Sequence, residues 1–210
     1  LSNVMYLITM RQLEGAIEQL HAAKDRLDGG LADTPDDSAL KGLLVEWNYL
    51  AMKLEISRAD TFVELDYYRN IIDITASEEG YLALHHWRGK LGMINNFRFW
   101  QQQGGDASAL EEADEKYIRS TENDLKENVQ TEIAAMRQRD DADFANALQR
   151  TLARYLLGSG QVDDALQELH ALAEVMEQDD STEDTELADL LLEVGELELQ
   201  HGQIDAAQKH

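Results

Sequence analysis

The stretch from Leu152 to Leu172 reads Leu-Ala-Arg-Tyr-Leu-Leu-Gly-Ser-Gly-Gln-Val-Asp-Asp-Ala-Leu-Gln-Glu-Leu-His-Ala-Leu. Apolar residues recur at helical spacing on both sides of Gly158-Ser159-Gly160, so the pattern predicts two helices joined by a tight turn. We expect the small residues Ala153 and Ala165 to lie where the two helices approach closely. The buried bulk would come from four leucines: Leu152, Leu156, Leu169 and Leu172. The stretch therefore predicts a helical hairpin.

Parts of this pattern return near both ends of the chain. The segment Gly-Gln-Ile-Asp-Ala-Ala at residues 202–207 follows Gly-Gln-Val-Asp-Asp-Ala at residues 160–165 by 42 residues. Residues 16–22, Ala-Ile-Glu-Gln-Leu-His-Ala, parallel residues 165–171, Ala-Leu-Gln-Glu-Leu-His-Ala. Self-similarity at such a period is the signature of a helical repeat array.

The pattern resembles the tetratricopeptide repeat, in which a Leu-Gly or Leu-Ala pair on the first helix and an early Ala on the second set the packing. Trp47-Asn48-Tyr49-Leu50-Ala51 and Leu91-Gly92 are further partial matches to the first-helix signature. The spacing is longer than the usual repeat and closer to the long-helix variants, and the proline that often closes a repeat is missing. The resemblance implies an all-α superhelix of antiparallel hairpins, with about nine helices. We expect residues 1–210 to form one such domain, cut from a longer protein.

The expected helices follow the apolar periodicity and the breaks in it. We place the first at residues 4–28, stopped by Gly29-Gly30, and open the second at Thr34-Pro35-Asp36-Asp37. The rest cover about 61–76, 78–103, 106–138, 143–157, 162–177 and 182–201, with a ninth from Ile204. The helix over 106–138 is unusually long, and the alternative is a break near residues 121–123, which would change the alternation of first and second helices downstream.

Two side-chain stripes run along the helix expected at 78–103. The apolar core stripe consists of Leu84, Trp87, Leu91, Ile94, Phe97 and Trp100. Rotated from it by about 100°, a second stripe consists of Tyr81, His85, Arg88, Gly92, Asn95 and Phe99, and we call it the polar-aromatic stripe. On the helix expected to open at residue 34, the core stripe is Leu43, Trp47, Leu50 and Leu54.

Composition restricts the classes of partner. The chain has 42 acidic and 18 basic residues, a net charge of −24 at pH 7. Such a field repels nucleic acid and anionic membrane and attracts basic protein segments. The alternative is that the charge serves solubility or a saline habitat. The sequence contains no cysteine, which excludes disulfides and thiol catalysis. No stretch approaches the ~20 apolar residues of a membrane span, so we expect a cytoplasmic protein without membrane insertion.

No pattern in the sequence indicates catalysis. Adjacent His85 and His86 would point about 100° apart on a helix and cannot both bind one metal ion. Residues 158–160 lack the preceding strand that a nucleophile elbow requires. The acidic segment 177–184 lacks the alternating ligands and central glycine of a calcium loop. Phosphate-binding and dinucleotide-binding motifs are absent. We therefore predict a protein that is not an enzyme and has no metal or cofactor.

The remaining prediction is binding. In the tetratricopeptide family, first helices line a concave surface that grips an extended peptide or a partner helix. The resemblance therefore implies a protein or peptide partner, and the negative net charge of the chain favours a basic partner. The candidate binding residues are Asn48, Tyr81, His85, Arg88, Asn95, Phe99, Arg150 and Arg154. The Lys and Arg residues are sparser than in the family's carboxylate clamp, which argues against a reader of C-terminal carboxylates.

Two function classes stay open at this point. The first is an adaptor or scaffold that binds a protein segment. The second is a sensor or regulatory domain of a larger protein that binds a small peptide or effector and controls a neighbouring domain. Since the end of a repeat array exposes apolar surface, homodimerisation through the terminal helices is a further hypothesis.

Overall fold

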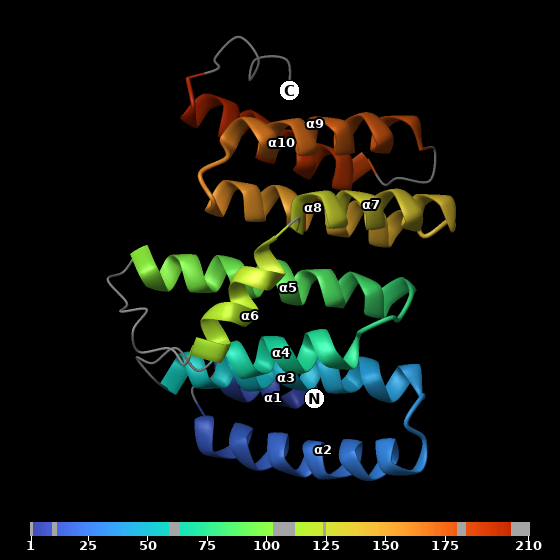
Figure 1. Cartoon of the computed structure of the whole chain (residues 1–210), viewed down its shortest axis with the longest axis vertical. Helices are drawn as coiled ribbons and strands as arrows, with labels where there is room; N and C mark the ends of the chain where they lie inside the picture. The colour runs from blue at the N-terminus through green and yellow to red at the C-terminus, as the bar shows by residue number, and fades with distance from the viewer. Residues whose placement is uncertain are drawn as a thin grey trace. The chain divides into compact units, whose positions relative to one another are not determined.

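The computed structural model describes residues 2–9, 12–58, 64–102, 112–123, 125–179 and 184–202. In these ranges all regular secondary structure is α-helical, which confirms the all-α prediction. Figure 1 shows the helices, which number ten in the described ranges. They are α1 (Ser2–Thr9), α2 (Leu13–Asp33), α3 (Ser38–Arg58), α4 (Glu64–Ile74), α5 (Gly80–Gln102), α6 (Glu112–Glu122), α7 (Leu125–Gln138), α8 (Ala142–Gly158), α9 (Val162–Gln178) and α10 (Asp184–Gln200). The helix expected from Ile204 lies outside the described residues.

The chain divides into two compact units, each described here by itself. The first unit, Leu1–Asn123, contains α1 to α6, and the second, Asp124–His210, contains α7 to α10. In both units, helices that follow one another in the sequence pack against each other. That neighbour-on-neighbour packing is the arrangement expected of stacked helical hairpins. A single repeat domain over residues 1–210 stays a prediction.

The predicted hairpin is formed by α8 and α9. Ala153, Ala165 and the four leucines of the hairpin are all buried, as predicted. At the turn, the amide of Gln161 donates to the carbonyl of Leu156 at 2.9 Å, and the amide of Gly160 donates to that of Leu157 at 2.9 Å. These two bonds and the positive φ of Gly160, 74°, form a Schellman motif, which satisfies carbonyls left open at the helix end.

The sequence pattern predicts one continuous helix at the start of the chain, and this prediction is wrong. The structure has α1 at Ser2–Thr9 and α2 from Leu13 instead of one helix over 4–28. By folding back, α1 places Val4 in a cluster with Ala16 and Leu20 of α2, where Val4 is 1% exposed. A continuous helix would leave this apolar segment in water, so burial favours the break.

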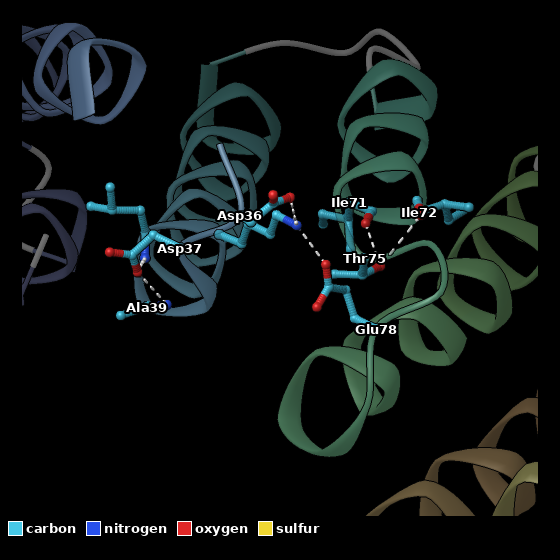
Figure 2. Close-up of polar contacts among 9 residues, drawn as sticks. Asp36, Asp37, Ala39, Ile71, Ile72, Thr75 and Glu78 are labelled. Carbon is cyan, nitrogen blue, oxygen red and sulfur yellow. Dashed lines mark hydrogen bonds and ion pairs between the residues drawn. The ribbon is translucent and has the colours of Figure 1, made fainter. Parts of the chain in front are cut away.

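The predicted stop at Gly29-Gly30 is also wrong, since α2 continues to Asp33. A β-carbon at residue 30 would lie 2.9 Å from Cδ1 of Leu40, so the glycine lets α3 approach α2 closely. The cap of α3 is Asp37, whose Oδ1 accepts hydrogen bonds from the amides of Ala39 and Leu40 at 2.8 and 3.0 Å (Figure 2). Asp37, the last residue of the predicted opening Thr34-Pro35-Asp36-Asp37, is therefore the residue that caps α3.

The start of α3 is tied to the turn between α4 and α5. Lys41 Nζ lies 2.5 Å from Glu78 Oε1, a contact drawn as a dashed line to Glu78 in Figure 2. Both side chains are largely shielded from solvent. The same pair raises the pKa of Lys41, through its hydrogen bond to Glu78. Thr75 ends α4 by donating its hydroxyl proton to the carbonyl of Ile71 at 2.6 Å. These contacts fix the register of α3 against the turn that leads into α5.

The long helix expected over 106–138 is two helices, and the alternative break near 121–123 is the observed one. The hydroxyls of Ser120 and Thr121 both bond the carbonyl of Tyr117, at 2.8 and 2.9 Å, in competition with the helix ladder. Ion pairs to Arg69 of α4 and Arg98 of α5 hold α6 in the first unit. The boundary between the two compact units falls directly after this break.

The apolar stripes locate most of the core. On α5, Leu84, Leu91, Ile94 and Phe97 are buried, while Trp87 and Trp100 are half-buried. On α3, Leu43 is 46% exposed, contrary to the prediction, and Leu44 and Val45 are buried. The difference arises because α3 is contacted by α1, α2, α4 and α5. A helix enclosed by four neighbours has no single inward face, so periodicity alone misplaces one position.

Candidate functional site

The polar-aromatic stripe lies on one face of α5, and its members differ widely in exposure. Tyr81 is 39% exposed and Phe99 is 62% exposed, whereas His85 is 5% exposed. Arg88 and Asn95 are half-buried between these extremes. The stripe therefore offers two aromatic side chains to solvent, with a cation and an amide between them.

His85 is packed between two tyrosines. The centroid of its ring lies 4.4 Å from that of Tyr81, edge to face, and 5.6 Å from that of Tyr49 on α3. Its Nδ1 atom lies 3.4 Å from the hydroxyl oxygen of Tyr49. Tyr81 in turn donates its hydroxyl proton to Oε1 of Glu46 on α3 at 3.0 Å. His85 thus joins α3 to α5 and holds the ring of Tyr81 at the surface.

The environment keeps His85 neutral near pH 7. The pKa of His85 is lowered to about 4, mainly by burial and also by the positive charge of Arg88, while the negative charge of Glu46 acts in the opposite direction. Burial likewise raises the pKa of Tyr49, and burial together with the hydrogen bond to Glu46 raises that of Tyr81. A neutral imidazole between neutral phenols is a packing and hydrogen-bonding arrangement, so this cluster orients side chains and carries no charge of its own besides Glu46 and Arg88.

In the middle of the stripe, Gly92 allows a close approach by α4. A β-carbon at residue 92 would lie 2.7 Å from Cε1 and 3.1 Å from the hydroxyl oxygen of Tyr68. The sequence had marked Gly92 as a small residue of a first-helix signature, and in the structure it makes room for this ring. Tyr68 thereby contributes a third tyrosine beside the polar-aromatic stripe.

Asn48, the candidate on α3, lies inside the first unit. It is 1% exposed, and its side-chain amide donates to the carbonyl of Leu44 at 2.8 Å. The residues of α3 that do lie against the polar-aromatic stripe are Glu46 and Tyr49, which sequence reasoning missed. Their spacing of three residues on one helix face was visible in the sequence, but choosing that face over the one with Asn48 required knowing which neighbours enclose α3.

Asn95 has an enclosed acceptor. Its Oδ1 atom is buried and accepts no hydrogen bond from any residue that the structure describes. Buried polar atoms are usually satisfied by hydrogen bonds, and each exception needs an explanation. The atom belongs to the same stripe as Arg88 and Phe99, so the polar-aromatic stripe contains an unsatisfied hydrogen-bond acceptor.

The two other candidates, Arg150 and Arg154, belong to the second unit. Arg150 places Nε 2.8 Å and Nη2 2.5 Å from Oε2 of Glu193 on α10, and Arg154 Nε lies 3.5 Å from the other carboxylate oxygen. The two arginines of α8 thus converge on one carboxylate. Arg150 therefore serves a contact within the unit, while the side chain of Arg154 is still 62% exposed.

A separate pocket of about 250 Å³ lies between α2, α3 and α4. Its walls include Trp47 and Tyr67, whose ring centroids are 6.4 Å apart, and Lys24 lies 5.6 Å from the ring of Trp47. Trp47 is fixed by donating its indole proton to the carbonyl of Leu20 at 2.8 Å. The other lining residues are Ile17, Leu20, His21, Asp25, Ala51 and Leu54.

His85 and His86 face different helices, as expected for neighbours on a helix. His86 places Nδ1 3.1 Å from the carbonyl oxygen of Ile72 on α4, whereas His85 contacts Tyr49 on α3. Within the described ranges, no three His, Asp or Glu side chains are grouped as metal ligands. A separate finding is that none of the helices described is long and apolar enough to cross a membrane.

The sequence matches no protein-family model, and neither a curated protein nor a solved structure is similar to it. The resemblance to tetratricopeptide repeats therefore rests on the sequence pattern quoted above.

Proposed function

We propose that this chain is a non-catalytic protein-interaction module, similar to a tetratricopeptide-repeat adaptor, that binds a peptide segment or partner helix along α3 and α5. The observation that carries the proposal is the exposure of Tyr81 and Phe99 on one face of α5, at 39% and 62%. Exposed aromatic side chains are typical anchors of protein interfaces because they bury a large area at a low cost in conformational entropy.

The surroundings of Tyr81 support the same proposal. Glu46 and His85 hold its ring in place before a partner arrives, and such preorganisation favours affinity because less freedom is lost on binding. Arg88 and Asn95 supply a cation and an amide between the two aromatic side chains, and an extended peptide offers backbone carbonyls to both. The net charge of −24 favours a partner segment that is basic outside the residues that contact Arg88.

The test is a pull-down from native lysate at low and moderate salt, with three baits compared side by side. These are the wild type, the double variant Arg88→Glu/Asn95→Ala and a control, Arg119→Glu, which makes the same charge reversal at a residue of α6 whose side chain is 74% exposed. We expect a protein that both wild type and control retain and the double variant loses. The melting temperature of the double variant should stay near that of the wild type. A large loss of stability would show that Arg88 is structural and would reject the site.

A second candidate function is favoured by the pocket of about 250 Å³ beside Trp47. In that case the chain is a sensor or regulatory domain that binds a small effector. A volume of this size is just below that of typical small-molecule sites, which begin near ~300 Å³. Native mass spectrometry of the purified chain would detect a bound molecule. An Ala51→Leu variant, which narrows the pocket, should lose it, while Phe99→Ala should not.

A further inference from the structure

The outward face of α10 is apolar. Leu192 is 63% exposed and Leu199 is 55% exposed. Ala188, one turn before Leu192, is exposed as well. Spacings of four and seven residues place these three side chains on one side of the helix. Among the described residues of the second unit, Leu192 and Leu199 are the large apolar side chains that face solvent.

The orientation of α10 is fixed by its other face. Leu190 and Val194 are at most 1% exposed, and they belong to a core cluster with Leu169 and Leu172 of α9. Leu187 and Leu191 are partly buried against the same cluster. A rotation that hid Leu192 would expose Leu190 and Val194, so the outward apolar face is a stable property of this unit.

The border of this face carries negative charge. Asp189 and Glu196 are both exposed, and α10 contains six acidic residues and no Lys or Arg over Asp184–Gln200. No ion pair reaches Asp189 or Glu196 from the residues that the structure describes. The two cations of α8, Arg150 and Arg154, pair with Glu193 instead.

We propose that the outward face of α10 is a docking site for a basic amphipathic helix of a partner protein. Ala188, Leu192 and Leu199 form an apolar stripe on α10, and an amphipathic helix can pack its own apolar stripe against such a face. Lys or Arg residues beside those anchors would face Asp189 and Glu196. A second copy of this chain is disfavoured as the occupant, because it would bring together two copies of α10, a helix with six acidic residues and no Lys or Arg. This site lies on a different helix and in a different unit from the polar-aromatic stripe, so it is independent of the function proposed above.

The test uses two synthetic helical peptides of equal length with the same leucine face. One carries Lys and Arg beside the leucines, and the other carries Glu at those positions. Binding to the full chain is followed by fluorescence anisotropy of the labelled peptide. We expect the basic peptide to bind and the acidic peptide not to. The double variant Leu192→Asp/Leu199→Asp should weaken the basic peptide by about 10- to 100-fold, from the loss of two buried leucine contacts.

This variant separates docking from general attraction. The two new aspartates make the chain more acidic, so a purely electrostatic association with the basic peptide would become stronger. Leu43→Asp adds an acid at an exposed apolar position of the first unit and serves as the matched control. It should leave the affinity within a factor of about two.

A second pair of substitutions keeps the test valid if the aspartate variant does not fold. Asp189→Lys/Glu196→Lys alters only exposed side chains and should move the preference from the basic to the acidic peptide. Equal binding by wild type and both variants would overturn the proposal. Sedimentation analysis that finds a dimer in the wild type and a monomer in Leu192→Asp/Leu199→Asp would also overturn it, since the occupant would then be a second copy.

Discussion

Gly92 of α5 and Tyr68 of α4 lie so close that a β-carbon on the glycine would be 2.7 Å from Cε1 of the tyrosine ring. The atoms of Tyr68 nearest to Gly92 are ring atoms and the hydroxyl oxygen, which move only as a rigid plane. The same helix pair is tight one turn away, where a β-carbon on Gly89 would lie 3.2 Å from atoms of Ile71 and Ile72. Two glycines spaced three residues apart thus set the distance between α4 and α5.

Gly92→Ala is therefore expected to destabilise the protein. The new methyl group must displace Tyr68 or separate the helices, and overpacking of this kind costs about 1–3 kcal/mol. The control is Gly29→Ala, because a β-carbon there would meet no atom within 4 Å and Gly29 lies inside α2. That control should stabilise the protein by up to ~1 kcal/mol through helix propensity. Urea unfolding followed by circular dichroism measures both.

Leu169→Ala tests the hairpin of α8 and α9. Leu169 is fully buried in the core cluster of the second unit, so its truncation should leave a cavity and cost about 2–5 kcal/mol. Leu192→Ala makes the same chemical change at a residue of that unit that is 63% exposed. It should change stability by less than ~0.5 kcal/mol. If the two variants lost equal stability in urea, the burial of Leu169 would not be what holds the hairpin together.

Gly160→Ala and Asp140→Gly test the turns of the second unit in opposite directions. Gly160 has a φ of 74° in the Schellman turn after α8, and Asp140 has a φ of 67° at the equivalent position after α7. A side chain at such a φ costs roughly 1 kcal/mol, so Gly160→Ala should lower the free energy of unfolding by about that amount. Asp140→Gly should raise it slightly. A loss of stability in Asp140→Gly would show that the aspartate side chain contributes more than its backbone strain costs.

The all-helical fold and the best-defined hairpin were predictable because they depend on local pattern. The spacing of Leu152, Leu156, Leu169 and Leu172 determines which side of each helix is buried, and the glycines between them determine the turn. The separation of α1 from α2 and of α6 from α7 was harder to predict, since apolar periodicity continues through both places. The separation of α1 from α2 depends on the burial of Val4 against α2. The separation of α6 from α7 depends on ion pairs that attach α6 to α4 and α5, between residues distant in sequence.

The candidate site was predictable on α5 and not on α3. On α5, the polar-aromatic stripe was visible as a set beside an uninterrupted core stripe. On α3, Asn48 and Glu46 are both polar, and nothing in the sequence favours Glu46 over Asn48 as the residue at the surface. Which of the two side chains is buried depends on how many helices surround α3, and the number of surrounding helices is a property of the tertiary structure. The pairing of Arg150 with Glu193, which lies 43 residues away, and of Arg154 with the same carboxylate could not be predicted for the same reason.

The stability of the first unit should depend on pH through His85. The folded state holds the pKa of His85 at about 4, below the ordinary value of 6.5, so the unfolded chain binds a proton more readily. The contribution of neutral His85 to the free energy of unfolding is therefore fully present above pH 6.5 and is lost as the pH falls toward 4. The groups that face His85 are Glu46 and Tyr49 of α3 and Tyr81 and Arg88 of α5.

His85→Phe keeps a ring between the two tyrosines and removes the titration. Urea unfolding at a series of pH values should show a smaller loss of stability in this variant than in the wild type between pH 6.5 and 4. Arg88→Gln should raise the pKa of His85, because it removes a nearby positive charge, and Glu46→Gln should lower it. Nuclear magnetic resonance titration of the imidazole measures both shifts. If Arg88→Gln left the pKa of His85 unchanged, Arg88 would have to lie turned away from the cluster, which would also remove it from the proposed binding surface.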